Sequence, residues 1–177
     1  MNFKELALKR ESCRDYSEKV VSHELLEEIM ETACLSPSAC NSQPWKLIAV
    51  EGQTAVQIRP LVQQNGRNKF TDKVSSFVAI CETKAKLLPG VRDDEQHFAQ
   101  MDIGMITMML TLAAADKEVS TCILGCFDEE KVKELLGIPE EARVRLVVAL
   151  GYSNTKEPRK KIRKDAGEVR NFNRWHA

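Results

Sequence analysis

The sequence predicts one globular domain that mixes α-helices with β-strands. The chain has 177 residues, a usual length for a single hydrophobic core. Hydrophobic residues make up 43% of it and charged residues 29%, as in ordinary globular domains and unlike disordered chains or membrane proteins. Helix-like and strand-like apolar patterns both occur, without a repeat or a low-complexity stretch. We therefore expect one domain over residues 1–177.

The first third of the chain predicts two helices, a loop and a strand. After a short helix over Phe3–Lys9, Ser22 is a favourable N-cap for a second helix. This helix should end before Pro37, because the residue before a proline resists helical angles. Its apolar face consists of Leu25, Leu26, Ile29, Met30, Ala33 and Cys34. The turn-forming residues 36–45 predict a loop, and residues 46–51 a strand.

The rest of the chain continues the mixed pattern. Residues 75–82 have the length and the β-branched and aromatic content of a buried strand. The strongest helix spans about 95–116, is apolar nearly all round and should be the central helix of the core. The other expected elements are a polar helix near 54–64, a strand over 119–127, a helix that Asp128 caps and Gly137 ends, and a strand over 143–150.

The charge balance argues against nucleic acid and membranes as partners. The 26 basic and 26 acidic residues cancel, so no global field attracts polyanions. The first residues carry scattered charges and no apolar h-region, unlike a signal peptide. The longest nearly uncharged run, residues 103–115, is shorter than the roughly 20 residues that cross a bilayer. A cytoplasmic protein is expected.

The six cysteines are expected to be free thiols in a reducing compartment. None forms a CxxC pair, and no histidine lies at a spacing that suits zinc, so no metal site is expected. The cysteines are Cys13, Cys34, Cys40, Cys81, Cys122 and Cys126.

Three separated segments carry side chains suited to an anionic, flat and polar ligand. In residues 10–14, two arginines flank Ser12, and their forked donors suit a phosphate. Residues 36–45 (SPSACNSQPW) offer amides that both donate and accept, as the edge of a pyrimidine-like ring requires. Residues 157–164 concentrate basic side chains in a polar tail. Taken singly, residues 10–14 fit a solvated helix end better than a binding site, and the other two segments also fit a turn-rich connector and a solvated tail.

Together the three segments resemble the FMN-dependent nitroreductase family over most of the chain. The compact branch is indicated, because residues 75–127 leave little room for the helical insertion of longer members. The motifs occur in the family's order: Arg10-x-Ser12-x-Arg14 with Tyr16 after it, the loop 36–45 leading into a strand, and Gly151-Tyr152 followed by Pro158-Arg159-Lys160. The sequence departs from the family in having Cys126 after Gly125, where a second glycine is frequent.

The resemblance implies an α+β fold, with a central, mainly antiparallel sheet flanked by helices, in an interlocked homodimer. Residues 152–177 would form a tail that extends onto the partner subunit. There, residues 170–175 would add to the edge of the partner's sheet and bury Trp175.

The resemblance also implies FMN as the cofactor, held by residues of both chains. Arg10 and Ser12 would hold the phosphate and the ribityl chain, and Arg14 would approach N1 and the C2 carbonyl of the ring. The second source of cations would be Arg159, Lys160 or Lys161. Pro37, Ser38, Ala39 and Asn41 would reach the flavin from the neighbouring chain. The remaining ring contacts would come from the backbone at Leu124 and Gly125 and from Asn65, Asn68 and Lys69.

The implied activity is transfer of hydride from NADH or NADPH, through flavin N5, to a nitroaromatic, a quinone or a similar small-molecule acceptor by a ping-pong mechanism. Because the flavin carries the chemistry, no side chain is a catalytic candidate. Arg14 would stabilise the negative charge that builds near N1. The three histidines, His23, His97 and His176, lie outside the three segments and are expected on the surface or in packing.

Two other classes of function stay open. A thiol redox protein could use Cys122 and Cys126 if the segment were helical, but the strand-like residues 121–127 argue against a helix there, and buried packing is expected for both. A non-catalytic module could bind an anionic partner through its basic tail. Nucleic acid is the less favoured anion, because aromatic side chains are absent from that tail until Phe172 and Trp175.

Overall fold

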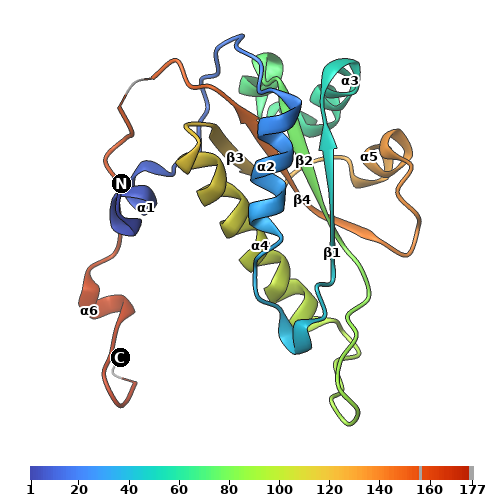
Figure 1. Cartoon of the computed structure of the whole chain (residues 1–177), viewed down its shortest axis with the longest axis vertical. Coiled ribbons are helices and arrows are strands. Elements are labelled where there is room, and N and C mark those ends of the chain that lie inside the picture. Colours follow the sequence, from blue (N-terminus) through green and yellow to red (C-terminus); the bar gives the residue numbers. More distant parts are fainter. Residues whose placement is uncertain (156, 176–177) are drawn as a thin grey trace.

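The computed structural model describes residues 1–155 and 157–175, and an antiparallel sheet of four strands lies at their centre (Figure 1). The strand order is β1-β2-β4-β3, and every neighbouring pair is antiparallel. The strands are β1 (Trp45–Val50), β2 (Ser76–Glu82), β3 (Ser120–Leu124) and β4 (Arg143–Gly151). The predicted α+β class with an antiparallel sheet is confirmed.

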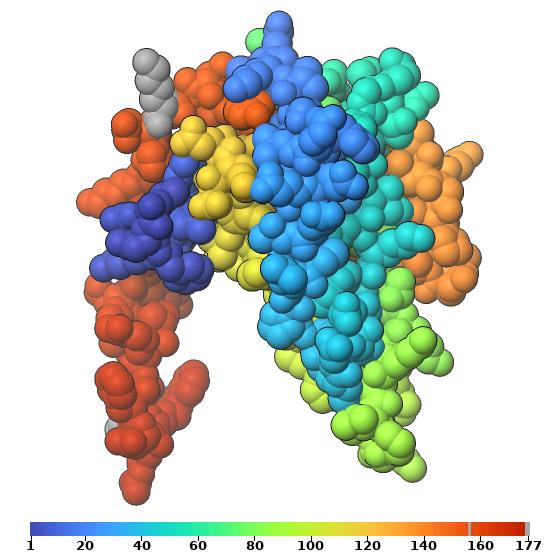
Figure 2. Space-filling model, viewed as in Figure 1, coloured from blue at the N-terminus to red at the C-terminus, as the bar shows by residue number. Residues whose placement is uncertain are grey.

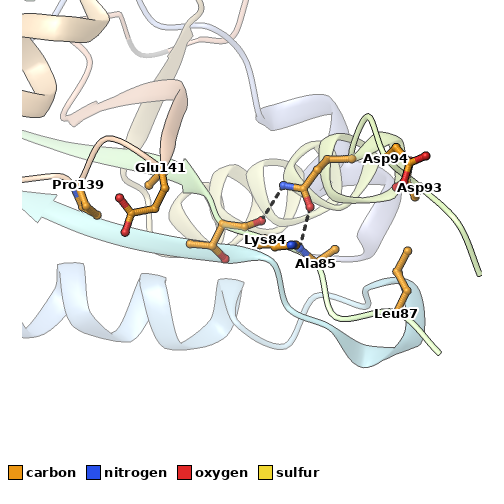
Figure 3. Close-up of a pocket in the computed structure, with 10 residues that line it drawn as sticks. Lys84, Ala85, Leu87, Asp93, Asp94, Pro139 and Glu141 are labelled. Carbon is orange, nitrogen blue, oxygen red and sulfur yellow. Dashed lines mark hydrogen bonds between the residues drawn. The ribbon is translucent and has the colours of Figure 1, made fainter. Parts of the chain in front are cut away.

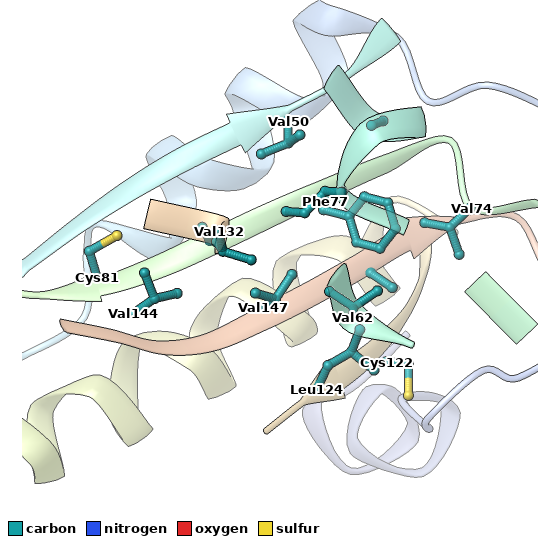
Figure 4. Packing of buried hydrophobic residues seen from close by; sticks show 14 of the residues in the cluster. Val50, Val62, Val74, Phe77, Cys81, Cys122, Leu124, Val132, Val144 and Val147 are labelled. Carbon is teal, nitrogen blue, oxygen red and sulfur yellow. The ribbon is translucent and has the colours of Figure 1, made fainter. Parts of the chain in front are cut away.

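Helices cover both faces of the sheet, because side chains of a strand alternate between its faces. Along β2, Phe77 packs in one core cluster with α3 (Gly52–Val62) and α5 (Glu129–Leu136), and Figure 4 shows it beside Val62 and Val74. Its neighbour Val78 packs in the other cluster with α2 (His23–Ala33) and α4 (His97–Asp116). Every residue of β2 is buried, so this strand is the centre of the core.

Helix α4 packs in the core as expected, but only one of its apolar sides is covered. Ile106 and Leu110 are fully buried, whereas Met101, Met105 and Met108 are 55%, 40% and 43% exposed. With 20 residues, α4 is longer than the uncharged run in the sequence, and by length and composition alone it could cross a membrane. It nevertheless packs against α2 and the sheet as a core helix does.

The expected helix ends are confirmed where a single side chain sets them. Helix α1 spans Phe3–Lys9, Ser22 Oγ accepts from the backbone N–H of Leu25 at 3.3 Å, and Asp128 caps α5. Gly137 ends α5 with a φ of 62°, where glycine is favoured. The expected strand over 119–127 is too long, because β3 pairs with β4 only as far as Leu124.

Residues 10–17 run beside strand β3 of the sheet. Ser12 forms a parallel bridge with Thr121 of β3, and the N–H of Cys13 donates to the Thr121 carbonyl at 2.8 Å. Tyr16 is 1% exposed and bridges to Ser153 at the start of the tail.

The tail leaves the body of the protein as a separate arm (Figure 2). It contains the short helix α6 (Ala166–Val169). Within this single chain Trp175 is 90% exposed and Phe172 is 84% exposed. Burial of Trp175 on a partner subunit therefore stays a prediction, and His176 lies outside the described residues.

Candidate functional site

The first and third sequence segments meet in one cavity of about 360 Å³ beside the start of β3. The cavity joins residues that are about 150 positions apart in the chain. Its lining residues are Arg10, Glu11, Ser12, Arg14, Arg159, Lys160, Lys161, Ile162 and Arg163. We call it the cation pocket.

Hydrogen bonds from Arg159 and Lys161 fix the tail against the amino-terminal segment. Arg159 Nε donates to Glu11 Oε2 at 3.0 Å, and its Nη2 donates to the Ser12 carbonyl at 2.6 Å. Lys161 Nζ donates to the Arg10 carbonyl at 2.6 Å. The tail therefore brings its cations to the bridge between Ser12 and Thr121 by contacts with the backbone as well as with a carboxylate.

The cation pocket has the electrostatics of an anion site. Six cationic side chains line it, and Glu11, its one lining carboxylate, is already paired with Arg159. Burial and the neighbouring guanidinium of Arg10 lower the pKa of Lys161. Arg10 Nε is buried without a hydrogen-bond partner among the described residues. A phosphate dianion would supply both the missing acceptor and the missing negative charge.

A second part of the candidate site lies where the chain leaves β3. Asn68 Nδ2 donates to the carbonyls of Val62 at 2.8 Å and of Cys126 at 3.3 Å. Residues 65–69, which include Asn65 and Lys69, are thereby held beside Leu124 and Gly125. Leu124 is buried in the core, whereas Gly125 is exposed, so its backbone faces solvent there.

The loop 36–45 is held in one conformation by polar contacts. The buried carboxylate of Asp102 accepts from the N–H of Ala39, and Ser38 Oγ accepts from the N–H of Gln43 at 2.9 Å. Cys40, Asn41 and Gln43 have φ values of 53°, 50° and 48°, a region that L-residues adopt at a cost. Such a strained backbone is stable only when surrounding contacts hold it in place, as Asp102 and Ser38 do here.

This loop lies at the opposite end of the sheet from the cation pocket (Figure 1). The Pro44 carbonyl accepts from Thr83 N–H at 2.9 Å, just after β2 ends. The cation pocket lies at the start of β3, which pairs with the far end of β4. Within one chain, therefore, the structure does not bring Pro37, Ser38, Ala39 and Asn41 to Arg10 and Ser12.

A larger cavity, of about 690 Å³, lies between the end of β2, the loop before α4 and residues 139–142 (Figure 3). Asp93, Asp94 and Glu141 line it with negative charge. The Asp93 carboxylate accepts from the N–H groups of His97 and Phe98 at 2.8 Å and so caps α4. This cavity is unsuited to a phosphate.

A family model described as the nitroreductase family matches residues 7–152. The chain belongs to the nitroreductase family. The predicted family is therefore confirmed, and the matched range includes the segments 10–14 and 36–45 as well as β3 with its exit.

Known nitroreductase-like proteins match most of the chain. The NADH dehydrogenase of Thermus thermophilus is 28% identical, with 86% of this chain and 87% of that protein covered. The oxygen-insensitive NADPH nitroreductase of Helicobacter acinonychis is 29% identical, with 91% of each covered. The crystal structure of the NADPH:FMN oxidoreductase of Vibrio harveyi, complexed with NAD⁺, superposes with a TM-score of 0.82 at 22% identity, covering 98% of this chain and 78% of that one.

In this nitroreductase, Cys122 and Cys126 do not form a thiol pair. Cys122 lies in β3 with 2% exposure, and burial raises the pKa of its thiol. Cys126 lies beyond the strand and is exposed, which corrects the expectation that both are buried. The reason is the early end of β3 at Leu124, which turns residues 125–126 out of the sheet.

Sequence reasoning missed two residues of the candidate site in this nitroreductase. Asp102 lies in an apolar stretch of α4, and Arg67 lies in a polar turn where arginines are ordinary. Arg67 Nη1 donates to Cys126 Sγ at 3.3 Å, and Asp102 holds Ala39. The one signal in the sequence was the rarity of an aspartate within so apolar a helix.

Proposed function

We propose that this protein binds FMN and passes reducing equivalents from NADH or NADPH to a nitroaromatic, a quinone or a similar small acceptor. The observation that carries the proposal is the cation pocket, in which Arg10 Nε is buried without a partner and one carboxylate stands among six cations. A nitroreductase-family chain with a terminal-phosphate site of this kind fits FMN. The reductant follows the relatives, which are named for NADH and for NADPH.

The residues present fit FMN along the length of β3. Arg10, Ser12, Arg159, Lys160 and Lys161 would hold the phosphate end beside Thr121. Gly125 exposes its backbone at the other end of the strand, next to the turn that carries Asn65, Asn68 and Lys69. At about 3.3 Å per residue, the five steps from Thr121 to Cys126 span at most about 16 Å. The strand is therefore long enough to present a phosphate and a ring at separate ends.

Bound flavin would supply the redox chemistry, accepting hydride from the nicotinamide and delivering it to the acceptor. The protein supplies position and charge. Within residues 1–155 and 157–175, Arg14 donates only a long hydrogen bond, of 3.4 Å to the Ser12 carbonyl, and its guanidinium lines the cation pocket. Its free donors support the proposal that it would stabilise negative charge on a bound anion or on a reduced ring. NADH or NADPH and the acceptor would bind one after the other at the same site beside the flavin, in a ping-pong mechanism.

The proposed functional unit is a cytoplasmic homodimer with two composite sites. Pro37, Ser38, Ala39 and Asn41 lie too far from the cation pocket of their own chain, so they would serve the partner's flavin. The exposed Met101, Met105 and Met108 on α4 give an apolar face of the kind that subunit interfaces bury. The tail, with Phe172 and Trp175 exposed, would cover the partner in the same way.

The cofactor content of the purified protein tests this function. We expect heat-released cofactor to co-migrate with FMN, and the protein to oxidise NADH or NADPH only when an acceptor is added. Recovery of FAD, or no flavin after incubation with FMN, would contradict the proposal. FMN binding without any oxidation of NADH or NADPH would leave a non-catalytic binder in its place.

A further inference from the structure

Arg67 lies at the exit of β3 with most of its guanidinium free. Its Nη1 donates to Cys126 Sγ at 3.3 Å, and this is the side chain's one hydrogen bond or ion pair among residues 1–155 and 157–175. A thiol is a weak acceptor, and a guanidinium carries five N–H donors. Arg67 therefore retains strong donors for a ligand.

The turn that carries Arg67 is fixed rather than free. The Asn68 amide ties it to the carbonyls of Val62 and Cys126, and Gln63 Nε2 donates to Thr71 Oγ1 at 3.0 Å. Asn65 and Asn68 both have positive φ, of 55° and 54°. The backbone at Arg67 is thus held against the end of β3, so the position from which its side chain extends is fixed.

The strand exit has an excess of positive charge. Lys69 is exposed and has no carboxylate within ion-pair distance in the described part of the chain. Of the carboxylates in this region, Asp128 pairs with Lys131 at 2.9 Å, whereas Asp72 accepts from the neutral amide of Gln63 at 2.6 Å and keeps its charge. Neither carboxylate forms an ion pair with Arg67 or Lys69 in the described part of the chain, so the two cations outnumber Asp72 beside Gly125 and Cys126.

These charges are separate from the cation pocket. The pocket adjoins Thr121, near the start of β3, whereas Arg67 contacts the second residue after its end. The cation pocket is suited to the cofactor's phosphate and Lys69 is a candidate contact of the flavin ring, whereas Arg67 has no proposed role in holding the cofactor. It adjoins the exposed backbone of Gly125, which is where an acceptor would approach.

We propose that Arg67 binds an anionic group of the electron acceptor, so that the protein prefers aromatic acceptors that carry a carboxylate over neutral ones of the same shape. The inference rests on the proposed function. A charge-assisted contact of this kind also explains why the guanidinium has no carboxylate partner among the residues that the structure describes.

Binding to the FMN-loaded protein gives a test that does not depend on turnover. Benzoate and benzamide differ in charge but hardly in shape, and isothermal titration calorimetry gives the Kd of each. We expect Arg67→Gln to weaken benzoate binding about tenfold relative to benzamide binding. Lys73→Gln is the matched control, because Lys73 lies on the same turn but its Nζ is 3.8 Å from Glu18, away from the strand exit. It should leave the ratio of the two Kd values unchanged.

The acceptor preference gives the second readout. We expect wild-type protein to show a higher kcat/KM for 4-nitrobenzoate than for its methyl ester, and Arg67→Gln to lower that ratio about tenfold. An equal ratio in wild-type and Arg67→Gln proteins, with both acceptors reduced, would overturn the inference and leave the proposed function standing. A shift in NADPH over NADH preference without a shift in acceptor preference would overturn it too. Absence of NADH or NADPH oxidation with both nitro compounds and with a quinone would overturn the proposed function and this inference with it.

Discussion

The carboxylate of Asp102 accepts a hydrogen bond from the backbone N–H of Ala39, with N···O distances of 3.1 and 3.2 Å. Asp102 is 1% exposed, so a charge is kept in the core helix α4 with a backbone donor from the loop 36–45. A buried carboxylate is costly unless it is hydrogen-bonded. This contact fixes to the rigid core a loop that has three strained residues and that we assign to the partner's flavin.

The first prediction concerns this contact. Asp102→Ala should lower the free energy of unfolding of the flavin-free protein by about 1–3 kcal/mol and weaken FMN binding, because the loop loses its anchor. Asp102→Asn keeps a carbonyl oxygen as acceptor and should recover most of the FMN affinity. Denaturant unfolding and fluorescence titration with FMN measure the two effects. Wild-type FMN affinity in Asp102→Ala would show that the loop is not part of the flavin site.

The second prediction concerns Arg14. Arg14→Met removes a positive charge from the cation pocket while keeping an apolar stem, so the protein should fold and still bind FMN. The bound flavin should have a more negative reduction potential and be reduced 10- to 100-fold more slowly by NADH or NADPH, which is about 1.4–2.8 kcal/mol of barrier. Spectroelectrochemistry and stopped-flow reduction measure both. An unchanged potential would remove Arg14 from the ring.

Local sequence signals predicted the fold where one side chain decides the outcome. Ser22 and Asp128 cap helices, and Gly137 ends one, through contacts within a few residues. The end of β3 could not be predicted in this way, because the apolar run continues to Phe127 and the pairing with β4 sets the limit. The exposure of the methionines on α4 could not be predicted either, because tertiary packing decides which side of an apolar helix the core covers.

The candidate site was predicted where the family's motifs carry it and missed where contacts are remote. Arg10, Ser12 and Arg14 meet the basic tail as expected. The contact between Arg67 and Cys126 joins residues 59 apart, and that between Ala39 and Asp102 joins residues 63 apart. No local pattern encodes such contacts, because the packing of α4 and the exit of β3 create them.

The third prediction uses the accessibility of thiols. If the flavin ring lies at the exit of β3, FMN should slow alkylation of the exposed Cys126 by iodoacetamide, relative to flavin-free protein. Cys34, exposed at the end of α2, is the internal control and should react equally with and without FMN. Peptide mass spectrometry resolves the two sites. Equal protection of both, or of neither, would place the ring elsewhere.

The same experiment has a pH dependence. Burial, with a smaller effect of Glu31, raises the pKa of the Cys34 thiol. Since the thiolate is the nucleophile, alkylation of Cys34 should keep rising with pH beyond the range around 8.5 where an ordinary thiol titrates. Cys81, whose pKa burial raises to about 11, should stay unreactive below pH 10 in the native protein.

The fourth prediction concerns packing beneath the site. A Cβ at Gly151 would lie 2.8 Å from Cδ1 of Tyr16, whose ring is fully buried. Gly151→Ala should therefore destabilise the protein by about 1–3 kcal/mol. The loss should shrink in a Tyr16→Leu background, because the clashing ring is absent and the two effects are then non-additive. Additive losses in thermal or denaturant unfolding would contradict this packing.

The composite flavin site is the central claim, and heterodimers of two defective chains test it most directly. Arg10→Ala and Asn41→Ala should each impair FMN binding. A control pair, Arg10→Ala with Arg159→Ala, alters two residues that line the cation pocket of one chain. The variants are mixed by unfolding and refolding, and tag-purified heterodimers are assayed for bound FMN and for NADH or NADPH oxidation.

The Arg10→Ala/Asn41→Ala heterodimer should recover about half of the wild-type activity and bind one FMN per dimer. One of its two flavin sites contains both substitutions, and the other consists of wild-type residues only. The Arg10→Ala/Arg159→Ala heterodimer should recover neither activity nor FMN binding, because each of its flavin sites contains one substitution. Failure of the first heterodimer to exceed its parent homodimers would contradict a site built from both chains.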